Sequence, residues 1–360
     1  MTNRRILAAC AALPALSLAP ALAACAGGPA EAPSPAPAAA QDARLASLAG
    51  GDPGTPVALP AGALTRDTTQ RYEYLSDFAV FVGREVGTDK GLVLAFDANR
   101  GRDREKYAAE HFAVLWVEGK GWVELDVTAT FAGAAEQFDA TYSAPLPSTE
   151  RVKVTGTAAT GLSLEIAKHG LRLAAEPCVV ETDQRHKRDG FVTGSSAGTL
   201  RYGEREFVGI VHHEFTYLAG VNPLAKTYTD LFGDGFHSVY GLVGTGGALR
   251  VHRSGGRLEP LIGTHSGFYA EDAAARGAGA LAGLKLETSK KSLGGLFRWP
   301  GRYKTNATLG ERKVALQVDL KDRETLINYV FGGVAIAIVK GEVTVDGDKQ
   351  PVLGFSLIVR

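Results

Sequence analysis

The stretch "GGVAIAIVKGEVTVDGDKQPVLGFSLIVR", residues 332–360, predicts a β-hairpin and decides the fold class. Apolar residues alternate on both sides of "DGDKQ" (346–350), and an Asp-Gly pair between two such runs is a strong hairpin signal. Short apolar alternations separated by glycine turns begin at Arg71 and continue through most of the chain. The sequence therefore predicts an all-β protein built from antiparallel strands.

The alternating pattern falls into two blocks. The first ends in "GTLRYGEREFVGIVHHEF" (198–215), and the second begins at "GFHSVYGL" (235–242). The segments "EGKGW" (118–122) and "AKHGL" (167–171) are expected to be hairpin connections, whereas "AEDAAARGAGALAGLK" (270–285) could form a short helix that its glycines would weaken. Two sandwiches fit the pattern of short strands as well as two barrels do. We expect the units to cover residues 63–220 and 221–360.

The N-terminus has the features of a bacterial lipoprotein signal peptide. Arg4 and Arg5 precede an apolar run that Pro14 and Pro20 interrupt, and Leu22-Ala23-Ala24-Cys25 resembles a lipobox. We therefore expect residues 1–24 to be removed, Cys25 to carry the lipid, and the Ala/Pro/Gly-rich segment 25–62 to be a flexible tether. Ala26 favours delivery to the outer membrane, facing the periplasm, over the inner membrane, by analogy with other lipoproteins.

Charge and cysteine content exclude several classes of function. The chain has 39 basic and 39 acidic side chains, so removal of Arg4 and Arg5 leaves a net charge of −2 and no basic excess for nucleic acid. Once Cys10 leaves with the signal and Cys25 is acylated, Cys178 has no partner for a disulfide. Neither a Walker motif nor HExxH occurs, and "GSSAG" (194–198) is expected to be a turn without the strand-to-helix context of a serine hydrolase. We expect no metal and no cofactor.

The order of segments in the second half resembles the carotenoid hydratase (hydroxyneurosporene synthase) family. The segments concerned are "HHEF" at a strand end, a meander beginning "GFHSVYGL", "GRYKTNATLG", and the closing "LGFSLIV". The resemblance covers most of residues 70–360 and implies two lipocalin-like β-barrels in tandem. It departs from the family where Tyr72 and Tyr74 stand in place of tryptophans and where Phe215 follows Glu214, so the fold is carried over but the carotenoid substrate is not.

The segment "VHHEF" (211–215) supplies the main catalytic candidates. If it is a strand, His212 and Glu214 share one face, whereas His213 and Phe215 share the other. On a barrel interior, Glu214 would orient His212 as a proton donor and raise the pKa of its imidazole. The alternative is that His212, His213 and Glu214 only form hydrogen bonds that bridge the two barrels.

Further candidates lie on neighbouring segments. His237 on "FHSVYGLV" could approach the pair from the second unit, and Asp234 lies in the turn just before it, where Asp-Gly most often only makes the turn. Tyr240 and Phe215 could stabilise a carbocation, and Trp116 could line a cavity or belong to the core.

The sequence favours an exported, lipid-anchored protein that binds a hydrophobic molecule such as a lipid, isoprenoid or polyketide. An enzyme of this kind would catalyse acid-catalysed hydration, isomerisation or cyclisation of an alkene without a cofactor, with His212, Glu214 and His237 as catalytic residues and His213, Phe215, Asp234, Tyr240 and Trp116 around the ligand. The alternative is a non-catalytic carrier or an envelope interaction protein. The oligomeric state is not predicted.

Overall fold

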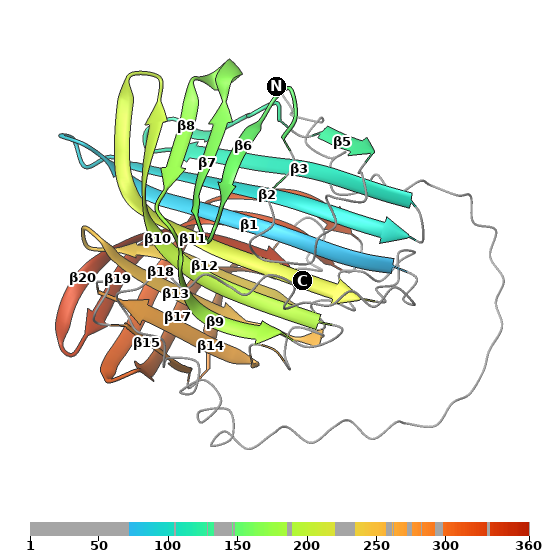
Figure 1. The fold of residues 1–360 in the computed structure, drawn as a ribbon. Coiled ribbons are helices and arrows are strands. Elements are labelled where there is room, and N and C mark those ends of the chain that lie inside the picture. Colours follow the sequence, from blue (N-terminus) through green and yellow to red (C-terminus); the bar gives the residue numbers. More distant parts are fainter. Residues whose placement is uncertain are drawn as a thin grey trace, which may run out of the picture.

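The computed structural model describes residues 72–103, 106–127, 129–132, 146, 148–185, 189–219, 235–256, 261, 263–271, 276–281, 283–291, 298–329 and 332–359. Within these ranges the chain forms two curled antiparallel sheets, one after the other (Figure 1). No helix in the described ranges has the length and apolar character needed to cross a membrane. The predicted all-β fold of two lipocalin-like units in tandem is confirmed.

The first sheet is centred on β1 (Tyr72–Glu85), which pairs with β2 (Gly91–Asp103) on one side and β11 (Arg205–Ala219) on the other. Its hydrogen-bonded order is β4-β3-β2-β1-β11-β10-β8-β7-β6, with β5 beside β3 and β9 beside β10. The remaining strands are β3 (Lys106–Val117), β4 (Gly121–Val123), β5 (Ala129–Ala132), β6 (Lys153–Thr157), β7 (Gly161–Ile166), β8 (Leu171–Ala175), β9 (Val179–Arg185) and β10 (Asp189–Tyr202). The segments expected as hairpin connections join β3 to β4 and, through a short 3-10 turn at Ala167–His169, β7 to β8.

The second sheet repeats this arrangement around β12 (Phe236–Val243), which pairs with β13 (Gly247–Arg253) and β20 (Asp348–Val359). Its order is β15-β14-β13-β12-β20-β19-β18-β17-β16. The remaining strands are β14 (His265–Ala270), β15 (Arg276–Ala280), β16 (Lys285–Lys291), β17 (Arg298–Leu309), β18 (Arg312–Tyr329) and β19 (Gly332–Val345). Asp346 and Gly347 both have positive φ, as a two-residue hairpin turn requires, and join β19 to β20 as predicted.

Two sequence expectations about local structure are wrong. Residues 276–280 form strand β15 and not a helix, because Gly277 and Gly279 let the strand approach β17 so closely that a Cβ at Gly277 would lie 2.4 Å from the backbone nitrogen of Gly310. The segment 194–198 is not a turn, because it lies inside the continuous strand β10 and pairs with β11.

The alternation along each strand divides the side chains between the inside of a sheet and the contact between the sheets. Phe81, Leu94 and Val211 belong to the apolar cluster inside the first sheet, and Val239, Leu249 and Val339 to the cluster inside the second. The opposite faces of the central strands pack against each other and form what we call the seam. The seam includes Phe78, Val80, Val82, Val93, Ala95, Trp116 and Phe191 of the first sheet and Phe236, Tyr240, Leu242, Ile336, Ile338, Leu353 and Phe355 of the second.

Candidate active site in the seam

Ionisable side chains enter the apolar seam along one row of the first sheet. Strand pairing aligns Phe78 on β1 with Asp97 on β2 and with Glu214 on β11, and Glu214 in turn with Thr193 on β10. Side chains directly opposite one another on neighbouring strands point to the same face. Asp97 and Glu214 therefore flank the ring of Phe78 on the face that meets the second sheet.

Glu214 is a carboxyl group that this environment alters strongly. Tyr240 of β12 donates a hydrogen bond of 2.7 Å from its hydroxyl to Glu214 Oε2, which joins the two sheets. Burial raises the pKa of Glu214 to about 7, the Tyr240 hydrogen bond opposes this rise, and the charge of Asp97 adds to it. Glu214 is consequently both an acid and a base near neutral pH.

His212 lies on the same face as Glu214, as its place on the strand predicts, but its protonation state differs from the expectation. Its Nε2 donates to the carbonyl oxygen of Gly241 at 3.1 Å, so the imidazole faces the second sheet. Burial lowers the pKa of His212 to about 4, and the bond to Gly241 offsets only part of this effect. The predicted rise in pKa through Glu214 is therefore wrong, because the cost of burying the charged imidazole dominates.

His252 on β13 is a site residue that the sequence analysis missed. Its Nε2 lies 3.6 Å from Glu214 Oε2, and the ring packs against Phe191, Phe236 and Tyr240. Burial lowers the pKa of His252 well below its usual value, and the charges of Arg250 and His212 lower it further. The imidazole beside Glu214 is therefore neutral. The predicted meander pairs β13 with β12, but only the contact between the two sheets brings His252 to Glu214, and that contact has no local sequence signal.

Asp97 was also missed, since a single aspartate in the middle of an apolar strand carries no signal of what will pack around it. It accepts hydrogen bonds from Ser76 Oγ at 2.8 Å and Asn99 Nδ2 at 3.0 Å. Burial raises the pKa of Asp97 to about 6, against the lowering effect of these two bonds. The row thus holds two carboxyl groups whose ionisation falls in the range useful for proton transfer.

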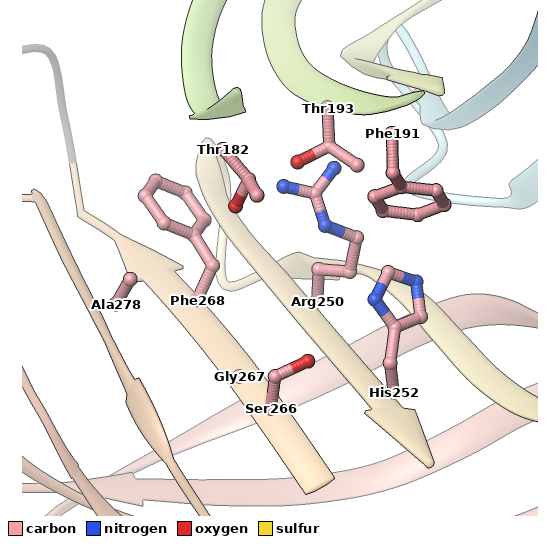
Figure 2. Close-up of a pocket in the computed structure, with 9 residues that line it drawn as sticks. All are labelled: Thr182, Phe191, Thr193, Arg250, His252, Ser266, Gly267, Phe268 and Ala278. Carbon is pink, nitrogen blue, oxygen red and sulfur yellow. The ribbon is translucent and has the colours of Figure 1, made fainter. Parts of the chain in front are cut away.

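A small cavity lies between β9 and β10 of the first sheet and β13 to β15 of the second (Figure 2). Its volume is about 20 Å³, the space of one water molecule. The residues that line it are Thr182, Phe191, Thr193, Arg250, His252, Ser266, Gly267, Phe268 and Ala278. Arg250 is ion-paired across the seam to Glu181 of β9, which also accepts a hydrogen bond from Ser195. Two residues of the lining are also neighbours of Glu214: His252, through the 3.6 Å contact, and Thr193, which is paired with Glu214 across β10 and β11.

The remaining predicted residues are distributed over three places. His213 bonds to Ser196 at 3.2 Å and Phe215 packs with Val192, both on the opposite face of β11 from Glu214. His237 bonds to Tyr303 at 3.0 Å. Trp116 lies in the seam and donates from Nε1 to Asp322 at 2.9 Å. Asp234 and Cys25 lie outside the described residues.

The structure therefore brings together Glu214, His212 and Tyr240 of the predicted set, and separates His237 and His213 from them. No group of three or more His, Cys, Asp or Glu side chains within the described ranges is arranged to hold a metal ion. In the described ranges the inside of each sheet holds a large cluster of the chain's own apolar side chains. The chemistry that the seam offers is proton transfer by a carboxyl group beside aromatic rings and a neutral imidazole.

Comparison with known proteins gives similarity of fold only. No family model matches the chain, and no curated protein matches its sequence. Among solved structures, an AttH-type protein of Nitrosomonas europaea is 11% identical with a TM-score of 0.49, over 85% of this chain and 97% of that one. Kievitone hydratase of Nectria haematococca is 9% identical with a TM-score of 0.44, over 84% and 92%. CghA, solved with Sch210972, is 12% identical with a TM-score of 0.44, over 86% and 96%. At these values the assignment of the fold rests on the strand pairing of this chain itself.

Proposed function

We propose that this chain is a cofactor-independent enzyme that hydrates, isomerises or cyclises an apolar alkene, with Glu214 as its proton donor. The observation that carries the proposal is the position of Glu214, a carboxyl group whose pKa is raised to about 7 on the face between two apolar sheets. A catalytic acid works best when its pKa lies near the working pH, and burial is the usual means of raising a carboxyl pKa that far.

The surroundings of Glu214 support a reaction through charge on the substrate. Phe78 and Tyr240 meet edge to face with ring centroids 5.6 Å apart, so aromatic faces are available beside the acid to stabilise positive charge. His212 and His252 are neutral because burial lowers the pKa of both. Neither imidazole therefore competes with Glu214 as the acid, in contrast to the sequence expectation for His212. His237 is not part of the proposed site, because its imidazole bonds to Tyr303 and lies apart from Glu214.

Solvent deuterium tests the proposal directly. The purified mature protein would be incubated in D₂O with apolar extract of the host envelope and with a panel of isoprenoid and polyketide alkenes, and products would be read by mass spectrometry. We expect deuterium incorporation with wild type and at least a hundredfold loss with Glu214→Gln, since general acid catalysis contributes roughly 10² to 10⁴ in rate. Glu342→Gln, at an exposed site on β19, is the matched control. Equal incorporation by both variants would refute the role of Glu214.

The competing function is a non-catalytic carrier or an envelope interaction protein. One observation favours the interaction protein: the cavity in the seam has a volume of about 20 Å³, far below that of a lipid or isoprenoid that a carrier would have to hold. Native mass spectrometry of protein purified from its own host separates the two. A co-purifying apolar molecule that never changes in D₂O identifies a carrier, and an empty protein that turns over none of the panel identifies an interaction protein.

Export and anchoring are a second part of the proposal, supported by the lipobox-like Leu22-Ala23-Ala24-Cys25. We propose acylation of Cys25, placement at the outer membrane facing the periplasm, and a tether from residues 25–62 that gives the domains reach. Metabolic labelling with an alkyne fatty acid should mark the wild-type protein and not Cys25→Ser, which should also leave the membrane fraction. Labelling of Cys25→Ser would disprove this attachment site.

A further inference from the structure

The cavity in the seam is lined by polar atoms in an otherwise apolar contact. Thr193 is only 1% exposed, and its hydroxyl has no hydrogen-bond partner among the described residues. His252 is 4% exposed, and its Nε2 likewise makes no hydrogen bond there, although it lies 3.6 Å from Glu214. A buried hydroxyl or imidazole without a partner destabilises the folded state, so such groups in a folded protein call for an explanation.

The other polar groups around the cavity are hydrogen-bond donors. Arg250 brings its guanidinium to the cavity and is held in place by Glu181 and by the ring of Phe268, 5.8 Å from the guanidinium carbon. Thr182 and Ser266 add two hydroxyl groups to the lining. Figure 2 shows Thr193, Arg250 and His252 around one common space. A donor-rich space the size of one water molecule suits one acceptor oxygen.

We propose that this cavity binds a single oxygen atom of the substrate, a carbonyl oxygen in the ground state and an enolate oxygen during reaction. The proposal rests on the proposed function and narrows its substrate to alkenes conjugated with a carbonyl group, for which the positive charge beside the aromatic rings develops on the added water and the negative charge on the carbonyl oxygen. Thr193 and Arg250 are the donors to this oxygen. His252 lines the cavity with its Nε2 3.6 Å from Glu214 Oε2, and Thr193 is paired with Glu214 across β10 and β11, so the acid lies beside the space that takes the oxygen.

The hydration step is balanced without any further reactant. The oxygen of a water molecule bonds to the carbon β to the carbonyl, while the C=C electron pair shifts so that negative charge reaches the carbonyl oxygen in the cavity. Protonated Glu214 gives its proton to the α carbon, and the resulting carboxylate recovers a proton from the added, positively charged water. Preorganised donors at the oxygen stabilise the charge that develops there, as in oxyanion holes.

The location of the cavity favours an oxygen over an apolar group. An apolar group in this space would leave Thr193 and His252 buried without partners, which a site built to hold oxygen avoids. Substitution Thr193→Val should therefore separate function from folding. It removes a hydroxyl that the fold does not use, so it should leave stability unchanged or raised, and it should weaken binding of an oxyanion about tenfold.

The test uses 4-nitrophenol, whose phenolate absorbs differently from the phenol, with the full mature protein at a pH below the pKa of the free phenol. We expect wild type to bind it as the phenolate, Thr193→Val to bind it about tenfold more weakly, and Thr305→Val to bind like wild type. Thr305 is the matched control because its hydroxyl also lacks a partner among the described residues and it lies on β17, away from the cavity. Absence of a phenolate spectrum, or equal weakening by both variants, would overturn the proposal.

Failure of this inference can be told apart from failure of the proposed function. Glu214→Gln should bind the phenolate at least as tightly as wild type, because a neighbouring negative charge is removed, while it loses deuterium incorporation. Phenolate binding in wild type together with undiminished turnover in Glu214→Gln would leave the oxygen site standing without the proposed acid. Loss of turnover in Glu214→Gln with no phenolate bound by wild type would leave the acid standing and refute the oxygen site.

Discussion

Tyr240 donates a hydrogen bond of 2.7 Å to Glu214 and thereby joins β12 of the second sheet to β11 of the first. Glu214 lies opposite Phe78 in the row of side chains that faces the second sheet. Its bond to Tyr240 is a direct hydrogen bond from this row to the second sheet. The same contact holds the sheets together and positions the proposed acid, so the stability and the activity of this protein should respond to the same proton.

Glu214→Gln should therefore change how stability depends on pH. The pKa of Glu214 is raised to about 7 in the folded protein from about 4.5 when unfolded, so between these values the folded state binds more protons and the free energy of unfolding falls as pH rises. The loss is at most roughly 3 kcal/mol, since one pKa unit corresponds to about 1.4 kcal/mol. Water reaches the 12% of the side chain that is exposed and keeps the loss below this limit.

Urea unfolding at several pH values checks this. We expect Glu214→Gln to match wild type near pH 4, below the unfolded pKa, and to exceed its stability near pH 8, while Glu342→Gln follows wild type throughout. If the stability of wild type did not decline relative to that of Glu214→Gln between pH 5 and 7, ionisation of Glu214 would not destabilise the folded protein. Its pKa would then not be raised, and Glu214 could not serve as the acid at neutral pH.

The two buried histidines of β11 should act in the opposite sense. Burial lowers the pKa of His212 to about 4, and that of His213 to about 3, where the charge of His212 adds to the effect. Their unfolded value is about 6.5. Stability from these groups is complete above pH 6.5 and is lost as pH falls toward the folded values, because the unfolded state takes up the protons first.

Nitrogen-15 NMR of the imidazoles tests this directly. His212 should be the neutral Nε2–H tautomer at pH 6, because Nε2 donates to Gly241, whereas the urea-unfolded protein should show imidazoles titrating near pH 6.5. An imidazolium signal from folded His212 at pH 6 would contradict the structure and would restore the histidine as a candidate acid.

Local patterns in the sequence predicted the strands and one half of the site. Alternation placed His212 and Glu214 on one face of a strand, and the Asp346-Gly347 turn fixed a hairpin, because both depend on neighbouring residues only. Asp97 and His252 could not be found this way, since their position beside Glu214 depends on strand pairing and on the contact between the sheets. The predicted pKa of His212 was wrong for a similar reason, because the burial that lowers it arises only when the two sheets pack together.

The Arg250–Glu181 ion pair should stabilise the contact between the two sheets. Both side chains are buried, 3% and 0% exposed, so removal of one partner leaves an uncompensated charge in the interior. We expect Arg250→Met to destabilise the protein by about 3–5 kcal/mol and the double variant with Glu181→Leu to destabilise it by less than the sum of the two single changes. The exposed pair Arg172–Glu165 is the control, where the same cycle should give a coupling of about 1 kcal/mol or less. Additive effects at Arg250 and Glu181 would mean that the ion pair does not couple the sheets.

Asp322 of the second sheet forms hydrogen bonds to the first sheet through both its backbone and its side chain. It adopts a positive φ of 44° at a bulge of β18. Its carboxylate accepts a hydrogen bond from Trp116 Nε1 at 2.9 Å, and its carbonyl oxygen accepts one from Trp122.

Asp322→Ala should destabilise the protein by about 2–3 kcal/mol, because it leaves the indole N–H of Trp116 without this acceptor and places a residue with a Cβ but no polar side chain at positive φ. Asp322→Asn is the matched variant, since asparagine tolerates this backbone and keeps a side-chain acceptor, and its stability should lie close to wild type. Tryptophan fluorescence during urea unfolding reads both effects. If Asp322→Asn proved as damaging as Asp322→Ala, the negative charge of the carboxylate would be what this joint requires, and the hydrogen bond to Trp116 would not explain its stability.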